Sequence, residues 1–428
     1  MKQKRLKYIV TMAILLATLP NISNRGQVPA DSLGSYLRMA AENNPGVRAD
    51  LLAYKAALQQ LPQAGAYPDP TLDMGFYLDP MAIVGGKQVA EFKVMQMFPW
   101  FGTKRAARTE AAHRAQMAYE KFRVGRDALY LEVYTQWYKL CALRQQLSNS
   151  QENRSLLTEL EQLATRRFSA AKTGMSVVLR VQMEEAEVEN ILESRRSQIA
   201  AETVKFNTLL NRPVNMPVAV PDSLQAVHYL FDEAATRARI ESQNPTLGRL
   251  QQEELASDAR QKLARKQGLP MLGIGLQYML NKKIDDPMLG MGNMNGRDMV
   301  MPMVSVTLPL YRHKYKAQLR QSQLQSEASH AQYDNTRNAL EAQLYATKQR
   351  LDDAARQVAL YRKQAALARS TYEVMVQEFV AGTTTLTDVI GVQRQLLDYR
   401  LKEAEAIADY NTQVASIRSL ASFGEIKN

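Results

Sequence analysis

The chain has 428 residues, of which 46% are hydrophobic and 23% are charged. This balance is typical of a folded protein and excludes a disordered chain. The single cysteine, Cys141, excludes an internal disulfide and a zinc cluster built on thiolates. The formal net charge is +11, but the basic residues are spread out with no dense block, which argues against nucleic acid as a partner.

The N-terminus predicts a secretory signal. Four basic residues between positions 2 and 7 precede an apolar run at residues 8–19, which is too short to span a bilayer. We assign residues 1–23 to the signal and leave the cleavage site open up to residue 30, since Val28-Pro29-Ala30 fits the small-residue rule. A buried N-terminal helix is the alternative. No later stretch reaches 18 apolar residues, so we expect no transmembrane helix.

The rest of the chain repeats itself after about 200 residues. Asn44-Pro45 recurs as Asn244-Pro245, "FPWFGTK" at 98–104 is answered by "LPLYRHK" at 308–314, and "RFSAAKTG" from Arg167 by "EFVAGTTT" from Glu378. These matches keep their order, which predicts a duplicated unit. Repeat one is residues 31–216 and repeat two is residues 217–428, joined by a proline-rich linker.

Each repeat is predicted to run helix, strand, strand, long helix, turn, helix. In repeat one we expect a helix at 32–66, a β-hairpin over 71–98 with strands at 71–79 and 88–98, a long helix at 103–167 and a helix at 176–210. In repeat two we expect a helix at 223–267, a β-hairpin over 271–308 with strands at 271–280 and 298–308, a long helix at 313–377 and a helix ending near 421.

The four predicted strands alternate in a way that suits a membrane. One face of the first carries Leu72, Met74, Phe76 and Leu78, and the later strands have similar apolar rows. Each strand has about 9–11 residues, the length that crosses a bilayer when tilted. A half-buried sheet of a soluble protein is the alternative. Rings that favour the membrane–water boundary lie just past the strand ends, at Trp100, Phe101, Tyr311 and Tyr315.

Four strands cannot close a barrel, because the smallest common barrel has about eight, and a bilayer tolerates no open sheet edge. A barrel must therefore be shared between chains. Two chains would give a barrel filled by side chains, so we predict a homotrimer with twelve strands.

The long helices predict a coiled coil. Residues 313–377 would span about 97 Å at about 1.5 Å per residue. Leu344, Leu351, Val358, Ala365 and Tyr372 fall seven apart and continue to residue 379. Stacked shorter helices would match each long one, giving four helix-equivalents per chain and a tube of twelve in the periplasm.

The duplicated unit, the two strand-to-helix switches and the turns at "RFSAAKTG" and "FVAGTTTLTDV" resemble the TolC family of outer-membrane efflux channels. The resemblance implies an α+β membrane protein, a trimeric twelve-stranded β-barrel continued by a twelve-helix periplasmic α-barrel, in the outer membrane of a Gram-negative bacterium. It implies a passive exit duct, driven by an inner-membrane transporter of the RND type through a periplasmic adaptor. The chain looks closest to the heavy-metal branch that holds CusC and CzcC-like channels.

The resemblance also implies site residues. Adaptor docking would fall on the helix tips, and an acidic ring at the periplasmic gate on Asp388. The pattern departs from the family at Gly391, where a second acid is expected, and at Thr384, where a base is expected. The alternatives are left-handed turn glycines and an aspartate in the first helical turn that is favoured by the helix dipole. The tip residues are Phe168, Ser169, Gly174, Phe379, Gly382 and Thr383.

Two further interpretations concern chemistry. Met288, Met291 and Met294 lie in one glycine-rich loop, where thioethers suit soft metal ions, although a flexible loop with incidental methionines is the alternative. We expect no enzyme and no cofactor, because the four histidines have no ligand spacing and phosphate-binding and nucleophile motifs are missing. The competing function is a soluble periplasmic coiled-coil adaptor or spacer.

Overall fold

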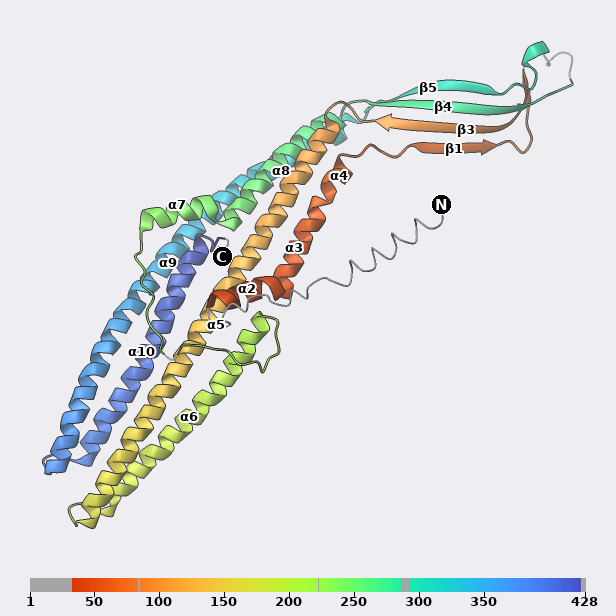
Figure 1. Cartoon of the computed structure of the whole chain (residues 1–428). Coiled ribbons are helices and arrows are strands. Elements are labelled where there is room, and N and C mark those ends of the chain that lie inside the picture. Colours follow the sequence, from red (N-terminus) through yellow and green to blue (C-terminus); the bar gives the residue numbers. More distant parts are fainter. Residues whose placement is uncertain (1–32, 84, 222, 286–291, 425–428) are drawn as a thin grey trace, which may run out of the picture.

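The computed structural model describes residues 33–83, 85–221, 223–285 and 292–424. Figure 1 shows an elongated molecule, in which the strands project from one end of a bundle of long helices. The turns that join the long helices to their partners lie at the opposite end. Strands and helical tips are therefore separated by the whole length of the helices.

Two helices set that length. Helix α5 (Thr103–Ser169) has 67 residues and α9 (Arg312–Ala381) has 70, so each is about 100 Å long. Helices α6 (Met175–Leu209) and α10 (Leu386–Leu420) follow them and return along their lower halves. The predicted long helices are confirmed, each extended by one turn or less at its ends.

The predicted heptad seam of α9 is also confirmed. The members from Leu344 to Phe379 are all buried, and Thr347, the one polar residue in the companion row, is buried with them. The Thr347 hydroxyl donates to the carbonyl oxygen of Gln343 at 2.7 Å, which satisfies it inside the helix. The seam packs mainly against α10.

The first helix of each repeat differs from its prediction. Residues 32–66 were predicted as one helix, but the structure has α2 (Leu33–Asn43), α3 (Pro45–Leu58) and α4 (Gln60–Ala64). In repeat two, α7 (Glu233–Gln243) ends before Asn244, and α8 (Pro245–Gln267) begins after it. The residue before a proline is disfavoured in the α conformation, so Asn44 and Asn244 take extended dihedral angles and break the helices.

A second correction concerns the start of the helix predicted at 223–267. Residues 223–232 are not helical, because Asn411 of α10 pairs with their backbone. The amide nitrogen of Val227 donates to Asn411 Oδ1 at 2.8 Å, and Asn411 Nδ2 donates to the carbonyl oxygen of Gln225 at 2.9 Å. A buried side chain thus replaces the hydrogen bonds that a helix would supply.

The strands form one antiparallel sheet in the order β1-β3-β4-β5, with a short β2 paired to β3. Both predicted hairpins are present, and the pairing of β3 with β4 joins repeat one to repeat two. β1 is shorter than predicted and ends before Leu78. Within the described chain, β1 and β5 each have a single strand partner, so both edges of the sheet are open. The bounds are β1 (Thr71–Phe76), β2 (Ala82–Ile83), β3 (Gly86–Phe98), β4 (Met271–Lys282) and β5 (Met299–Thr307).

The register confirms the predicted faces. Leu72, Val94, Leu276 and Pro302 are successive partners across the four strands and form one apolar row. Side chains on this face are exposed in the single chain, with Ile274 at 63% and Val304 at 80%. The neighbouring row, on the opposite face, holds charged and polar groups such as Asp73 and Lys93.

The core of the molecule lies along the helices. Its middle part is an aromatic cluster in which the Tyr36 ring of α2 meets the Phe206 ring of α6 edge-on, 5.2 Å between centroids. Trp137 of α5 lies 5.4 Å from Tyr36. This cluster fixes the short helices of repeat one against the middle of α5, between the sheet and the tips.

Candidate functional site: the helical tips and the strand–helix junctions

The tip of the first hairpin is the turn between α5 and α6. Ala171 takes a left-handed conformation there, with φ of 56°, and the amide of Lys172 donates to the carbonyl oxygen of Arg167 at 2.9 Å. Gly174 is extended, with φ of −84°. The interpretation that Gly174 supplies the left-handed geometry is therefore wrong, because Ala171 occupies that position. Phe168, Ser169 and Gly174 are exposed.

The second tip follows α9 and does use its glycine. Gly382 has φ of 85°, and its amide donates to the carbonyl oxygen of Phe379 at 3.1 Å. The left-handed role expected for Gly382 is confirmed. Gly382 and Thr383 are exposed, whereas the Phe379 side chain is only 4% exposed. A direct contact with a partner would therefore fall on the other five tip residues.

Arg167 joins the two tips. Its guanidinium lies over the Phe379 ring, 4.8 Å from the centroid, and donates to the carbonyl oxygens of Phe379 and Val380. Phe379 belongs to an apolar cluster shared by all four long helices. The sequence singled out Phe379 but not Arg167, because nothing in the pattern shows which basic side chain faces the other hairpin.

Asp388 lies in the first turn of α10 and is exposed. The Thr385 hydroxyl donates to Asp388 Oδ2 at 2.5 Å, and the Asp388 amide donates to Thr385 Oγ1 at 3.4 Å. Thr385 is thus the N-cap of α10, and the Asp388 carboxylate accepts a hydrogen bond from its hydroxyl. Gly391, one turn further, has no other group within 4 Å of the position that a Cβ would take, and Thr384 is half-buried. The first-turn position of Asp388 is confirmed, and its gate role stays a prediction.

A bidentate ion pair links the two helical hairpins, α5–α6 and α9–α10, above their tips. Arg394 of α10 donates through Nε and Nη2 to both carboxylate oxygens of Glu184 on α6, at 2.7 and 2.5 Å. Glu187 lies 3.4 Å from the same guanidinium. Hydrogen bonding to Glu184 and the charges of Glu184 and Glu187 raise the pKa of Arg394. The planar guanidinium makes two parallel hydrogen bonds to the carboxylate, so this ion pair fixes the relative orientation of the two side chains as well as attracting them.

Helix α10 also bonds to α5. The Gln393 amide donates to Asn153 Oδ1 at 2.6 Å in a buried site, and Arg400 Nη1 donates to Glu152 Oε2 at 2.5 Å. These residues and the Arg394 pair could not be predicted from the sequence, since single polar residues within long helices carry no local signal. A buried polar link between hairpins resists sliding of one hairpin past the other.

At the other end, aromatic side chains surround the strand-to-helix junction. The rings of Trp100 and Phe101 meet edge-on at 6.0 Å, and Lys266 Nζ donates to the Phe101 carbonyl oxygen at 3.1 Å. Phe101 and Tyr311 are 79% and 84% exposed, Trp100 is exposed and Tyr315 is half-buried. An apolar hollow of about 480 Å³ lies at this junction, lined by Trp100, Phe101, Tyr67, Phe98 and Leu272 among others.

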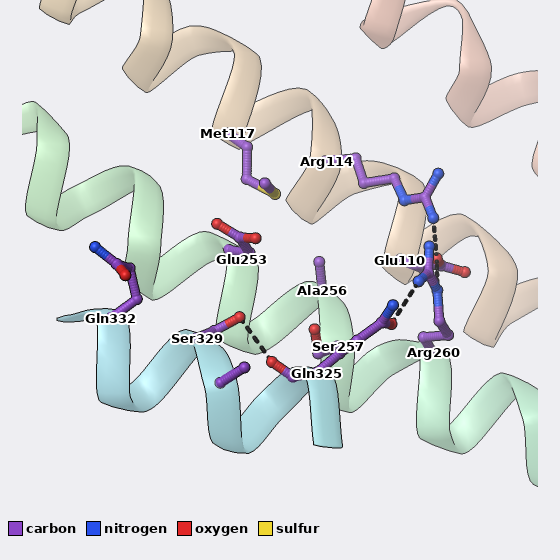
Figure 2. Close-up of a pocket in the computed structure, with 11 residues that line it drawn as sticks. Glu110, Arg114, Met117, Glu253, Ala256, Ser257, Arg260, Gln325, Ser329 and Gln332 are labelled. Atoms are coloured by element: carbon purple, nitrogen blue, oxygen red, sulfur yellow. Dashed lines mark hydrogen bonds and ion pairs between the residues drawn. The ribbon is translucent and has the colours of Figure 1, made fainter. Parts of the chain in front are cut away.

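Beside the sheet, a hollow of about 590 Å³ lies between α5, α8 and α9. Figure 2 shows that Arg114 and Arg260 both point to Glu110. The two nitrogen–oxygen distances are 2.8 and 2.9 Å, and Arg260 also donates to Gln325 Oε1 at 2.8 Å. Arg260 of α8 thus bonds to Glu110 of α5 and to Gln325 of α9. These contacts beside the hollow link the three helices to one another.

The described residues also lack a metal cluster and a membrane-spanning helix. Among them, no three histidines, cysteines or carboxylates come together in a way that would hold a metal ion. In the same part of the chain, none of the helices combines the length and the apolar character needed to cross a membrane. Cys141 is buried, and burial raises the pKa of its thiol to about 12, so it stays protonated and unreactive.

Comparisons with solved structures show the same fold in outer-membrane channels. VceC of Vibrio cholerae is 14% identical, with a TM-score of 0.71 over 92% of this chain and 97% of that chain. CusC is 13% identical, with a TM-score of 0.74 over 92% of each chain. The CmeC outer membrane channel of Campylobacter jejuni is 12% identical, with a TM-score of 0.71 over 92% of this chain and 87% of that chain.

The sequence itself carries a family signature. No curated protein matches the chain. The family model described as outer membrane efflux protein matches residues 237–422, which covers α8, the second hairpin, α9 and α10. Residues 237–422 are therefore similar to the outer membrane efflux protein family, and the described chain shares its fold with solved outer-membrane channels.

Proposed function

We propose that the chain is the outer-membrane duct of a tripartite efflux pump. The observation that carries the proposal is a sheet whose edges, β1 and β5, are both open and whose apolar face is exposed. Its inner strands β3 and β4 have 13 and 12 residues, enough to cross a bilayer. Each unpaired backbone group in a bilayer costs several kcal/mol, so such a sheet is stable there only when neighbouring copies close it. Three chains supply twelve strands, which close a barrel with β1 of one copy against β5 of the next.

The helices continue this barrel into the periplasm. Helices α5 and α9 are about 100 Å long, and the shorter helices run along them in stacked pairs. Three copies give a tube of twelve helix-equivalents in line with the barrel. The duct is passive, and energy comes from an inner-membrane transporter of the RND type.

The tips are the docking surface for a periplasmic adaptor. Phe168, Ser169 and Gly174 of the first hairpin and Gly382 and Thr383 of the second are exposed at the end furthest from the sheet. Phe168, Met175 and Val380 are exposed apolar side chains at or next to the two turns, and exposed apolar surface that gathers in one place supports a contact with a partner. Phe379 supports this surface from beneath, through Arg167.

The same end holds the gate. Arg394 and Glu184 link the second hairpin to the first, so separating the hairpins would require this ion pair to open. Three copies of Asp388 form an acidic ring that favours cations, as rings of carboxylates do in other channels. Gly391 adds no side chain to this ring.

A bilayer experiment tests the duct. The purified protein, reconstituted in a planar lipid bilayer, is expected to give discrete conductance steps. A soluble periplasmic spacer, the alternative function, would give none and would fractionate with the periplasm. Membrane fractionation of cells that express the chain separates the two, because a duct is recovered with the outer membrane.

A further inference from the structure

The polar face of the sheet is rich in methionine. The register places seven of the 20 methionines of the chain on this face, and only Met74 of the strand methionines on the apolar face. Leu276 and Val304 are apolar because their face of the sheet would contact lipid. The opposite face also holds Asp73 and Lys93, so contact with lipid does not explain apolar side chains there. These methionines therefore need another explanation.

The thioethers form a continuous series. Along β4, the polar-face residues from Met271 to Met279 define five successive rows across the sheet, and each row contains at least one methionine. Residues two apart on a strand are separated by about 6.6 Å, so neighbouring rows are within reach of long side chains. From the helix end the row members are Met271, then Met97, then Met95 with Met303, then Met301, then Met279 with Met299.

The tightest part of the series is built around two glycines. Gly273 and Gly275 of β4 leave a gap, with Met97 and Met95 opposite them on β3. The sulfurs of Met97 and Met95 lie 2.6 and 3.1 Å from the point where a Cβ on Gly273 would sit. The sulfur of Met95 also lies 3.0 Å from the equivalent point on Gly275. Both thioethers thus occupy space that any other residue at position 273 would fill.

A third thioether borders the same gap. Met303 of β5 is the register partner of Gly275 on the side away from β3. Next-nearest strands are about 10 Å apart, so side chains from β3 and β5 can approach one another over a glycine. Charged neighbours are paired, since Lys93 Nζ lies 3.6 Å from Asp73 and Gln277 donates to Glu91 at 2.8 Å. The gap is bordered by these methionines and by Ser305, whose Cβ lies 3.1 Å from the point where a Cβ on Gly273 would sit, and none of these side chains is charged.

We infer that this methionine series is a binding path for soft monovalent metal ions, Cu(I) or Ag(I), with its strongest site at Met95, Met97 and Met303. Thioethers are ligands that such ions prefer, whereas hard ions choose oxygen. The inference rests on the proposed function, which makes the polar face the wall of the duct. It assigns a metal-binding role to the strands. The soft-metal hypothesis for the loop of Met288, Met291 and Met294 stays a prediction, because Met288 and Met291 lie outside the described residues.

Silver binding by the purified, detergent-solubilised protein tests the inference. The probe is silver nitrate in chloride-free buffer, with bound silver measured by equilibrium dialysis. The variant Met95→Leu/Met97→Leu/Met303→Leu conserves volume and removes three sulfurs from the gap. Met74→Leu, on the apolar face, is the matched control. We expect the triple variant to bind silver at least about tenfold more weakly than the wild type, and Met74→Leu to bind it unchanged.

A second measurement needs no variant. Silver is expected to protect Met95, Met97 and Met303 of the wild-type protein from peroxide oxidation, as read by peptide mass spectrometry, and to leave Met74 unprotected. Equal silver affinity in all three proteins, or no selective protection, overturns the inference. Absence of conductance steps from the wild type in a bilayer overturns the proposed function instead, whether or not silver binds.

Discussion

The side-chain amide of Asn244 donates a hydrogen bond to the carbonyl oxygen of Leu420 at 2.9 Å. Its oxygen accepts from the amides of Thr246 and Leu247, so one side chain both starts α8 and terminates α10. Asn44 makes the same contacts in the first half, with its amide on Leu209 at 3.1 Å. Recurrence of this join at equivalent positions supports a duplicated unit.

Removing the hydrogen bonds of the Asn244 side chain should lower the stability of repeat two. Asn244→Ala deletes a helix cap and leaves the buried Leu420 carbonyl oxygen without its partner, a cost of about 1–3 kcal/mol. We expect the thermal dissociation midpoint of the purified assembly to fall. The control is Asn335→Ala, on an exposed position of α9, which should leave the midpoint unchanged. An equal midpoint for Asn244→Ala and the wild type would argue against the join.

The two tips make a paired prediction, because Ala171 and Gly382 occupy equivalent left-handed positions. A left-handed residue with a Cβ costs about 1–2 kcal/mol relative to glycine. Ala171→Gly should therefore slow hydrogen exchange in the first turn, and Gly382→Ala should speed it in the second. A Cβ on Gly382 meets only Arg167 Nη2 at 3.6 Å, so the effect comes from the backbone and not from a clash. Shifts of the same sign in both variants would contradict this.

These tips also show where prediction from sequence succeeds and fails. The long helices, the buried heptad positions and the strand faces were predictable from periodicity. A sustained repeat of apolar residues indicates both the type of element and the face that it buries. The left-handed residue of the first turn was predicted wrongly as Gly174. The turn needs one such residue, and Ala171 takes that conformation. The link between Arg394 and Glu184 joins residues 210 positions apart on different hairpins, so only the packing reveals it.

Loss of that link should favour an open channel. Arg394→Ala removes the bidentate contact between α10 and α6, and we expect a higher open probability or larger conductance in single-channel recordings. Arg196→Ala is the matched control, since it breaks an ion pair with Glu193 inside α6 alone. Recordings of Arg394→Ala that match the wild type would exclude a gating role for the pair.

Asp388→Asn separates the acidic ring from the helix cap. An asparagine oxygen can still accept from the Thr385 hydroxyl, so the cap is kept while the charge is removed. If three Asp388 carboxylates select cations, the reversal potential in a salt gradient should shift toward that of an unselective pore. Unchanged selectivity would leave Asp388 only with its place in the first turn of α10.

The central claim is that one chain brings too few strands to close a barrel, so that three chains share it. Native mass spectrometry of the protein extracted in mild detergent tests this most directly, with circular dichroism recorded on the same sample. We expect a mass of three chains, three times 48.2 kDa less any removed signal, with β-structure retained. A single chain that keeps its β-structure in detergent would contradict the account.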